Sequence, residues 1–374
     1  MTTVRLIDQE IDPYNYPAIE RTLVEGVAAG TAPPTILRCT FAPDLFLELG
    51  PVEDASLIDT DAAESHDVAY GRRFHSGGGT GFFRGDNTPL LYLFFPDSGE
   101  AMTDLLDAAG RAISASLRAA GVDQAEYGGG ADVEAVVDGE RVKLGVSGAG
   151  YQDGVWGVVG NVINRSYGED EFAIIDDVLR LPKEKFEDKD TDSVAGRMSE
   201  VQTVAPGTDI DVVLDEAVAN ITDIIDRTAE EGSFTDDERT AIDEYTAEAR
   251  TDDWFHRYST TRLLADYGEE DRVAEVAFKS EKLIKASVIV GPDDVVRDIQ
   301  FTGDMYHRPA YEALSRLEES VQHEAIDDVD AIRTDMERVF DQSDVEFPWL
   351  SPEDFVRTVD RANRNLIPVP DFER

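Results

Sequence analysis

Hydrophobic positions along the chain repeat with two different periods, which predicts a mixture of helices and strands. Residues 100–120 show the helical period most clearly, because one apolar stripe runs from Leu105 to Leu117 and Gly121 then ends the segment. The predicted helices cover residues 14–29, 100–120, 171–180, 209–228 and 309–322.

Short β-prone runs predict the strands. Residues 89–95 are apolar throughout, as expected for a buried strand, and Asp138-Gly139 is a strong hairpin signal between two further runs. Helices mixed with several hairpins indicate an α+β fold on a mixed, mostly antiparallel sheet. The predicted strands cover residues 35–41, 45–49, 68–75, 89–95, 132–137, 140–147, 155–164, 271–278, 283–290 and 295–301.

The length of 374 residues suggests two domains. A polar, acidic stretch divides the chain, and within it Thr235 and Glu238 form the signature of a helix-capping box. At the other end, Ser351-Pro352 is a good helix start, and Pro368 and Pro370 indicate a loose end. We therefore predict a catalytic-size domain over 1–228, an acidic helical linker over 229–252, a small α+β domain over 253–345 and a tail over 346–374.

Charge narrows the possible environments and partners. The chain carries 79 acidic against 34 basic residues, a net charge of −45, yet 41% of its residues are hydrophobic, which favours folding over disorder. Acidic residues spread over the whole chain are typical of a halophilic protein from an acidic proteome, since concentrated salt screens the repulsion between their negative charges. Such a surface disfavours nucleic acid as a partner.

The sequence also excludes several classes of protein. No apolar segment approaches the length that spans a membrane, and no signal peptide is recognised, so we expect no membrane partner and a cytoplasmic location. Cys39 is the single cysteine, which excludes a disulfide scaffold and a cysteine-ligated zinc site.

The first candidate for chemistry is the segment Arg72-Arg73-Phe74-His75-Ser76-Gly77-Gly78-Gly79. A glycine run after a strand lets another molecule approach the backbone and exposes N–H donors. Two adjacent arginines can neutralise a carboxylate or a phosphate. A flexible loop tip is the alternative that these residues alone leave open.

The second candidate is a predicted hairpin that carries Asp132, Lys143 and Val146-Ser147-Gly148. Lysine is scarce in this chain, and Lys143 is the first one, which favours a specific role over a solvated surface charge. On a regular strand Arg141, Lys143 and Gly145 would share one face.

These segments together resemble the lipoate–protein ligase A family of the biotin/lipoate ligase superfamily. In that family two arginines precede a triple glycine that lines the lipoyl and adenylate site, and Asn87 stands where the family has its asparagine. Asp132 matches an aspartate near the nucleotide and its metal, and Ala131 replaces the asparagine before it. Weaker matches occur at Ser193 to Val201.

The family's lysine is expected immediately before Val146, where this chain has Gly145. Lys143 lies two residues earlier, and we expect it to lean into the space that Gly145 leaves. Phe83 and Val159 stand where many members carry histidine.

The resemblance continues into the predicted small domain and covers residues 14–340. Trp254 resembles the tryptophan that opens a fused accessory domain, and the segments Lys282 to Val288 and Ile299 to Met305 resemble its strands. For Gly303-Asp304 we favour the role of a strand-end turn.

The resemblance implies a lipoate–protein ligase, which uses ATP and Mg²⁺ to convert lipoate or octanoate into an acyl-adenylate. The acyl group then passes to a lysine of a lipoyl carrier domain, in a dehydrogenase-complex acyltransferase or a glycine cleavage carrier protein. Lys143 would be catalytic, and Asp132 would hold the metal. The implied lipoate- and adenylate-binding residues are Arg72, Arg73, Ser76, Gly77, Gly78, Gly79, Asn87, Val146, Ser147 and Gly148.

Two other functions remain open at this point. One is an octanoyl or lipoyl transferase that works without ATP and uses a thiol or a lysine. The other is a catalytically impaired paralogue that binds lipoate or a lipoyl domain, for which Gly145 is the best support.

Overall fold

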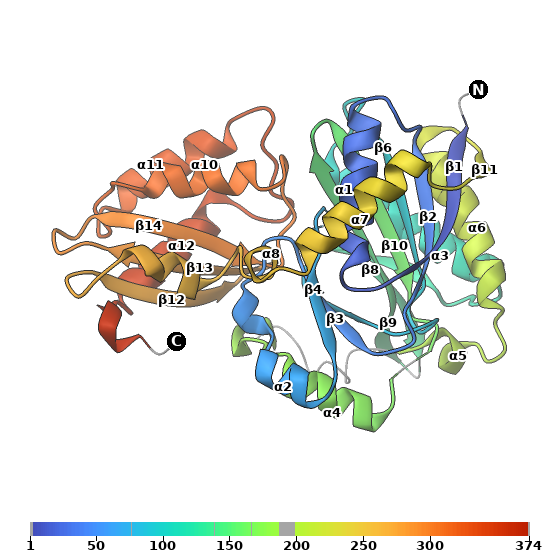
Figure 1. The fold of residues 1–374 in the computed structure, drawn as a ribbon, viewed down its shortest axis with the longest axis horizontal. Helices are drawn as coiled ribbons and strands as arrows, with labels where there is room; N and C mark the ends of the chain where they lie inside the picture. The colour runs from blue at the N-terminus through green and yellow to red at the C-terminus, as the bar shows by residue number, and fades with distance from the viewer. Residues whose placement is uncertain (1–2, 76, 138, 166, 187–198, 373–374) are drawn as a thin grey trace.

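The computed structural model describes residues 3–75, 77–137, 139–165, 167–186 and 199–372, and its largest feature is an eight-stranded sheet (Figure 1). The strand order is β11-β1-β2-β6-β10-β9-β8-β7. β1 pairs in parallel with β11 and β2, and the other neighbours are antiparallel, which confirms the predicted mixed, mostly antiparallel sheet. The strands are β1 (Val4–Ile11), β2 (Thr35–Phe41), β6 (Leu90–Pro96), β7 (Glu126–Gly129), β8 (Asp132–Val137), β9 (Glu140–Gln152), β10 (Val155–Val162) and β11 (Ala229–Glu231).

Helices cover both faces of this sheet. α3 (Met102–Ala119) and α6 (Ile210–Thr222) share one hydrophobic core with the sheet, and the predicted stripe from Leu105 to Leu117 is buried there. α1 (Asn15–Ala28) packs on the other face against α7 (Asp236–Ala249). Within the described ranges, no helix is both long and apolar enough to cross a membrane.

The acidic segment 229–252 forms the predicted helix, which packs against α1 on one face of the large sheet. The α7 helix begins at Thr235 with the expected capping box. Arg5 of β1 contacts Glu238, with Nη2 2.6 Å from Oε1, and β11 adds an edge strand beyond residue 228. The large sheet and its helices therefore extend to about residue 249, past the predicted boundary.

A three-stranded sheet in the order β4-β3-β5 stands beside the large one. Its strands are β3 (Phe46–Leu49), β4 (Ala69–Arg72) and β5 (Gly81–Phe83). The helices α2 (Thr60–Ser65) and α4 (Glu169–Val178) share a small core with it. The glycine segment follows β4 directly, so this sheet positions the segment.

The C-terminal part is a four-stranded antiparallel sheet in the order β14-β13-β12-β15. Three helices share its core, and Figure 1 shows this part beside the large sheet, with α8 near the junction. The elements are β12 (Arg272–Lys279), β13 (Leu283–Val290), β14 (Val296–Gly303), β15 (Ile367–Pro368), α10 (Glu312–Val321), α11 (Val329–Phe340) and α12 (Pro352–Asn363). The shorter helical elements of the chain are α5 (Val201–Val204), α8 (Asp252–Phe255), α9 (Thr260–Leu263), η1 (Ala55–Leu57), η2 (Lys183–Phe186), η4 (Asp223–Ile225), η5 (Leu264–Asp266) and η6 (Val369–Asp371).

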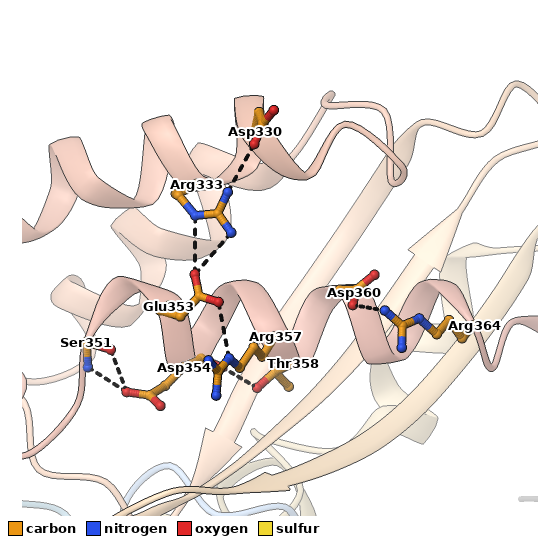
Figure 2. A network of polar contacts seen from close by, with 9 residues as sticks. All are labelled: Asp330, Arg333, Ser351, Glu353, Asp354, Arg357, Thr358, Asp360 and Arg364. Atoms are coloured by element: carbon orange, nitrogen blue, oxygen red, sulfur yellow. Dashed lines mark hydrogen bonds and ion pairs between the residues drawn. The ribbon is translucent and has the colours of Figure 1, made fainter.

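Residues 345–366 contribute to this second core. Phe355 of α12 is fully buried in it, and Figure 2 shows Glu353 of the same helix accepting hydrogen bonds from Arg333 of α11 and from Arg357. The prediction of a loose end at Pro368 and Pro370 is wrong, because β15 pairs with the edge of β12 and Val369 is buried.

Glu318 of α10 gives a testable effect of pH on stability. Its Oε1 accepts the N–H of Phe301 at 2.7 Å, and burial raises its pKa to about 8 from an ordinary 4.5. Because the folded state holds the proton more tightly, the stabilisation is complete below pH 4.5 and is lost as pH rises towards 8. Glu318→Gln should therefore raise the free energy of unfolding at pH 8 by roughly 2–4 kcal/mol, and much less at pH 4.5.

The measurement is urea unfolding at both pH values. Glu319→Gln, at the exposed neighbouring position, is the control, and it should change the free energy of unfolding equally at the two pH values. Equal unfolding midpoints for Glu318→Gln and the wild type at pH 8 would contradict the prediction.

Candidate active site

A cavity of about 570 Å³ lies where the glycine segment, the β8–β9 hairpin and the C-terminal part meet. This volume suits a small-molecule ligand. Its described lining includes four cationic and three acidic side chains, although acidic residues outnumber basic ones more than twofold in the chain. The apolar and aromatic lining consists of Tyr16, Phe82, Phe83, Leu90, Ala131, Val146, Val159, Ile163, Leu179, Leu181, Tyr306 and Trp349.

The glycine segment lines the cavity, but the protein itself uses two of its amides. Gly77 N–H donates to the carbonyl of Ala149 at 3.1 Å, and Gly78 N–H donates to that of Met305 at 3.3 Å. A Cβ at Gly78, where φ is +94°, would lie 2.9 Å from the Tyr306 hydroxyl. These two glycines thus permit close approach of the C-terminal part, a different use from the predicted phosphate donors.

Arg73 lies at the cavity and holds the same segment. Its Nη2 donates to the carbonyls of Gly78 at 3.3 Å and Gly79 at 2.8 Å. Burial opposes its charge, but Tyr16 and Glu48 outweigh burial and raise the pKa of Arg73. It therefore stays a cation beside the cavity. Ser76, the other predicted residue of this segment, lies outside the described residues.

The structure gives Arg72 a different role from the predicted one. Its side chain is fully buried, is absent from the described cavity lining, and donates from Nε, Nη1 and Nη2 to backbone carbonyls only. Burial lowers its pKa to about 10. The shortest of these bonds, at 2.6–2.9 Å, reach Glu53 and Phe255, and longer ones reach Gly50, Pro51 and Tyr258.

Lys143 points into the cavity and forms an ion pair there, with Nζ 2.8 Å from Oδ1 of Asp132. A bulge interrupts the ladder at this point, because Val133 lies opposite Gly145 while the next residue, Glu134, lies opposite Lys143. The bulge breaks the alternation of faces. Lys143 and Val146, three residues apart, consequently both line the cavity, and Gly145 does not.

The expectation that Gly145 leaves space for a side chain is wrong. A Cβ at this position would lie within 3.0 Å of the Asn161 carbonyl on β10, a distance that real Cβ atoms do not adopt. The glycine thus allows two strand backbones to come together. Any side chain at position 145 must push β9 and β10 apart.

We therefore expect Gly145→Ala and Gly145→Lys to destabilise the fold by about 1–3 kcal/mol or more, the usual effect of overpacking. Urea unfolding measures this effect. Gly268→Ala is the matched control, because a Cβ at Gly268 meets no atom within 4 Å. A stable Gly145→Lys variant with gained activity would contradict this reading of the strand.

The tripeptide after the bulge also lines the cavity. Asn161 Oδ1 accepts the Val146 N–H at 2.9 Å, and the Ser147 carbonyl accepts from the Tyr306 hydroxyl at 3.3 Å. Gly148 has no room for a Cβ against Val159. This tripeptide therefore links the cavity floor to the C-terminal part.

Four other positions of interest are buried. Asn87 is absent from the described lining, and its carbonyl accepts the N–H groups of residues 164 and 165. Phe83 and Val159, where many family members have histidine, form part of the apolar wall. Cys39 is fully buried in β2, away from the described lining, and burial raises the pKa of its thiol.

Sequence reasoning named no residue of the C-terminal part as belonging to this site. Lys282, Asp304, Tyr306 and Trp349 all line the cavity. Asp304 Oδ1 also accepts the Leu283 N–H at 2.7 Å, in keeping with the predicted strand-end turn. One signal was available, because the chain has only seven lysines and the same scarcity that singles out Lys143 applies to Lys282.

The cavity offers limited ligands for a metal ion. Its aspartates are Asp132 and Asp304, and no cluster of three or more metal-binding side chains occurs in the described part of the chain. Magnesium in nucleotide sites commonly uses one or two carboxylates together with phosphate oxygens. These residues fit an Mg²⁺ ion that enters with a nucleotide.

Comparison with solved structures identifies the fold as that of lipoate–protein ligases. A bipartite lipoate protein ligase from Thermoplasma acidophilum, described with its E2 lipoyl domain, has 19% identity and a TM-score of 0.56 over 69% of this chain and 98% of that one. A lipoate–protein ligase A bound with ATP has 16% identity and a TM-score of 0.55 over 68% and 99%.

P. falciparum LipL1 in complex with lipoate has 12% identity and a TM-score of 0.64 over 96% of this chain and 98% of its own. No protein-family model matches the chain, and a search among curated proteins finds no match. At these identities the likeness establishes the fold, and it confirms the fold that the sequence motifs predicted.

Proposed function

We propose that this chain is a lipoate–protein ligase, which activates lipoate or octanoate with ATP and transfers the acyl group to a lysine of a lipoyl carrier domain. The observation that carries the proposal is the joining of an apolar wall and a cationic cluster in one cavity of this fold. The ATP-bound and lipoate-bound solved relatives support the same pair of substrates.

The apolar wall suits the acyl chain of the substrate. Phe82, Phe83, Val159 and Leu181 offer a surface that excludes water, and no charged side chain of the described lining comes from β10. A saturated chain of eight carbons gains free energy on entering such a slot, at about 0.8 kcal/mol for each buried CH₂ group.

The cationic cluster suits the carboxylate and the phosphates. During activation a carboxylate oxygen attacks the α-phosphorus of ATP, and pyrophosphate leaves. Both reactants are anions, so Lys143 must reduce their repulsion and hold the carboxylate against the phosphate. Its ion pair with Asp132 orients the ammonium group in advance of binding.

Magnesium would be held by Asp132, with Asp304 in the same cavity, and when bound it would neutralise charge on the polyphosphate. In the second step the neutral amine of a carrier lysine attacks the carbonyl of the acyl-adenylate, an amide forms, and AMP leaves. The T. acidophilum ligase described with its E2 lipoyl domain supports a lipoyl domain as the carrier. We propose a dehydrogenase-complex acyltransferase or a glycine cleavage carrier protein as its source.

The ATP-independent transferase is the second candidate. A thiol route lacks support here, because Cys39 is buried and burial raises its pKa. Acyl transfer through Lys143 stays open, and it would differ from the ligase reaction because it would not require ATP. The third candidate, a binding paralogue, loses its main support because Gly145 is required by the approach of Asn161.

One assay separates these functions. Purified protein is incubated with lipoate, ATP and Mg²⁺ in molar KCl, chosen because screening removes the repulsion expected at a net charge of −45. Formation of lipoyl-AMP and release of pyrophosphate are the expected results. Transfer without ATP would favour the transferase, and lipoate binding without lipoyl-AMP would favour the binding paralogue.

A further inference from the structure

The turn between β12 and β13 brings a lysine of the C-terminal part into the cavity. Lys282 donates from Nζ to the carbonyl of Gly130 at 3.3 Å. Its ammonium group lies 4.5 Å from the ring centre of Trp349 and 5.1 Å from that of Tyr306. One carbonyl and two aromatic faces therefore fix this cation in place.

Lys282 does not resemble a solvated surface lysine. Desolvation lowers its pKa, while Asp304 and Asp132 act in the opposite direction. Only seven lysines occur in the chain, and three of them line this cavity. An ordinary surface charge in this protein is acidic, so a lysine in this position needs a specific explanation.

The position of Lys282 relative to Lys143 points to an anionic ligand. The two lysines line the same cavity, the charge of Lys143 opposes that of Lys282, and Asp132 attracts both. The left-handed turn at Gly129 and Gly130, with φ of +86° and +62°, presents the carbonyl that holds Lys282. Two like charges brought together are stabilised when an anion binds between or beside them.

We propose that Lys282 is a second cationic ligand for the phosphate groups of the nucleotide, supplied by the C-terminal part. This proposal rests on the proposed ligase function and names which residue of the second sheet takes part in activation. The C-terminal part already lines the cavity, and Lys282 would complete the phosphate site from that side. Lipoate, whose chain lies against the apolar wall, does not depend on Lys282 for binding.

The test uses the full-length chain and two half-reactions. Lys282→Met should reduce lipoate-dependent exchange between ATP and pyrophosphate by about 10²–10³-fold, the usual effect of losing one preorganised charge. The KM for ATP should rise while the Kd for lipoate stays within twofold. Lys282→Arg should restore at least a tenth of the exchange, which a merely structural loss would not allow. Arg297→Met removes a partly exposed positive charge from the same sheet, one that pairs with Asp293 and does not line the described cavity, and should leave exchange unchanged.

A second measurement does not depend on catalysis. Inorganic pyrophosphate should raise the melting temperature of the wild type and of Arg297→Met, and should fail to raise that of Lys282→Met. Equal stabilisation of all three proteins, or exchange by Lys282→Met within twofold of the wild type, overturns the role of Lys282. A wild type that is stabilised by pyrophosphate through Lys282 but makes no lipoyl-AMP would instead overturn the ligase function alone.

Discussion

Lys143→Met is expected to reduce lipoyl-AMP formation by about 10²–10³-fold and to leave the fold intact. In the proposed reaction Lys143 supplies the charge that faces the carboxylate and the α-phosphate, and loss of one such preorganised group typically costs a few kcal/mol of transition-state stabilisation. Its side chain is about a quarter exposed, so removal of the ion pair with Asp132 should change the free energy of unfolding little. Lipoyl-AMP is measured by single-turnover assay, and lipoate binding is measured separately and should persist.

Arg141→Met is the matched control for this change. Arg141 lies two residues away on the same strand, but it pairs with Glu126 and Glu134 and is absent from the described cavity lining. The Arg141→Met substitution therefore removes one positive charge, as Lys143→Met does, but at a position that does not face the proposed substrates. Wild-type activity in Lys143→Met, or an equal loss in both variants, would remove Lys143 from the site.

The parts of the fold that sequence predicts well are long and locally periodic. The helix α3 follows from its apolar stripe and the strand β6 from its unbroken apolar run, since both signals come from one contiguous segment. The strand β1 was not predicted, because its acidic residues weaken the alternation and its partners β2 and β11 come from distant parts of the sequence. The helix α11 was also omitted, although Ile332, Met336 and Val339 carry helical spacing.

The site was harder to predict for a geometric reason. The assignment of Lys143 and Gly145 to one face of the sheet assumes a regular strand. The residue types do not predict the bulge that changes the faces on which these side chains lie. Gly145 resembles a lost lysine in sequence, whereas in the structure it is the only kind of residue that fits against Asn161. The contribution of Lys282 depends on packing between two sheets, which no local pattern records.

The paired arginines show the same limit. Arg72 and Arg73 are equivalent in sequence, but neighbouring side chains of an extended segment point to opposite sides. Arg73 reaches the cavity and the glycine carbonyls, while Arg72 points into the protein interior. Its contacts with Phe255 and Tyr258 join the small sheet to the segment that leads into the C-terminal part.

Arg72→Met should therefore act on stability, with an expected loss of about 4 kcal/mol or more in the free energy of unfolding. Removal of the guanidinium takes the Arg72 donor from the carbonyls of Pro51, Glu53 and Phe255, while those of Gly50 and Tyr258 keep a backbone N–H donor. Each buried carbonyl left without a donor costs about 1–3 kcal/mol. Methionine fills much of the volume but donates no hydrogen bond. Urea unfolding in molar KCl measures the loss. Arg72→Lys keeps the charge and three donors, so its free energy of unfolding should lie between those of Arg72→Met and the wild type.

Arg73→Met distinguishes this structural role from ligand binding, because Arg73 is the member of the pair that lines the cavity. Its loss should weaken ATP-dependent activation even at temperatures where the variant is fully folded. Arg72→Met, assayed under conditions where it remains folded, should bind ATP as the wild type does, since the Arg72 guanidinium donates hydrogen bonds to backbone carbonyls and lies over the Phe255 and Tyr258 rings in the interior. An Arg72→Met protein of wild-type stability with impaired ATP binding would return Arg72 to the phosphate site and would contradict the interior position of its side chain.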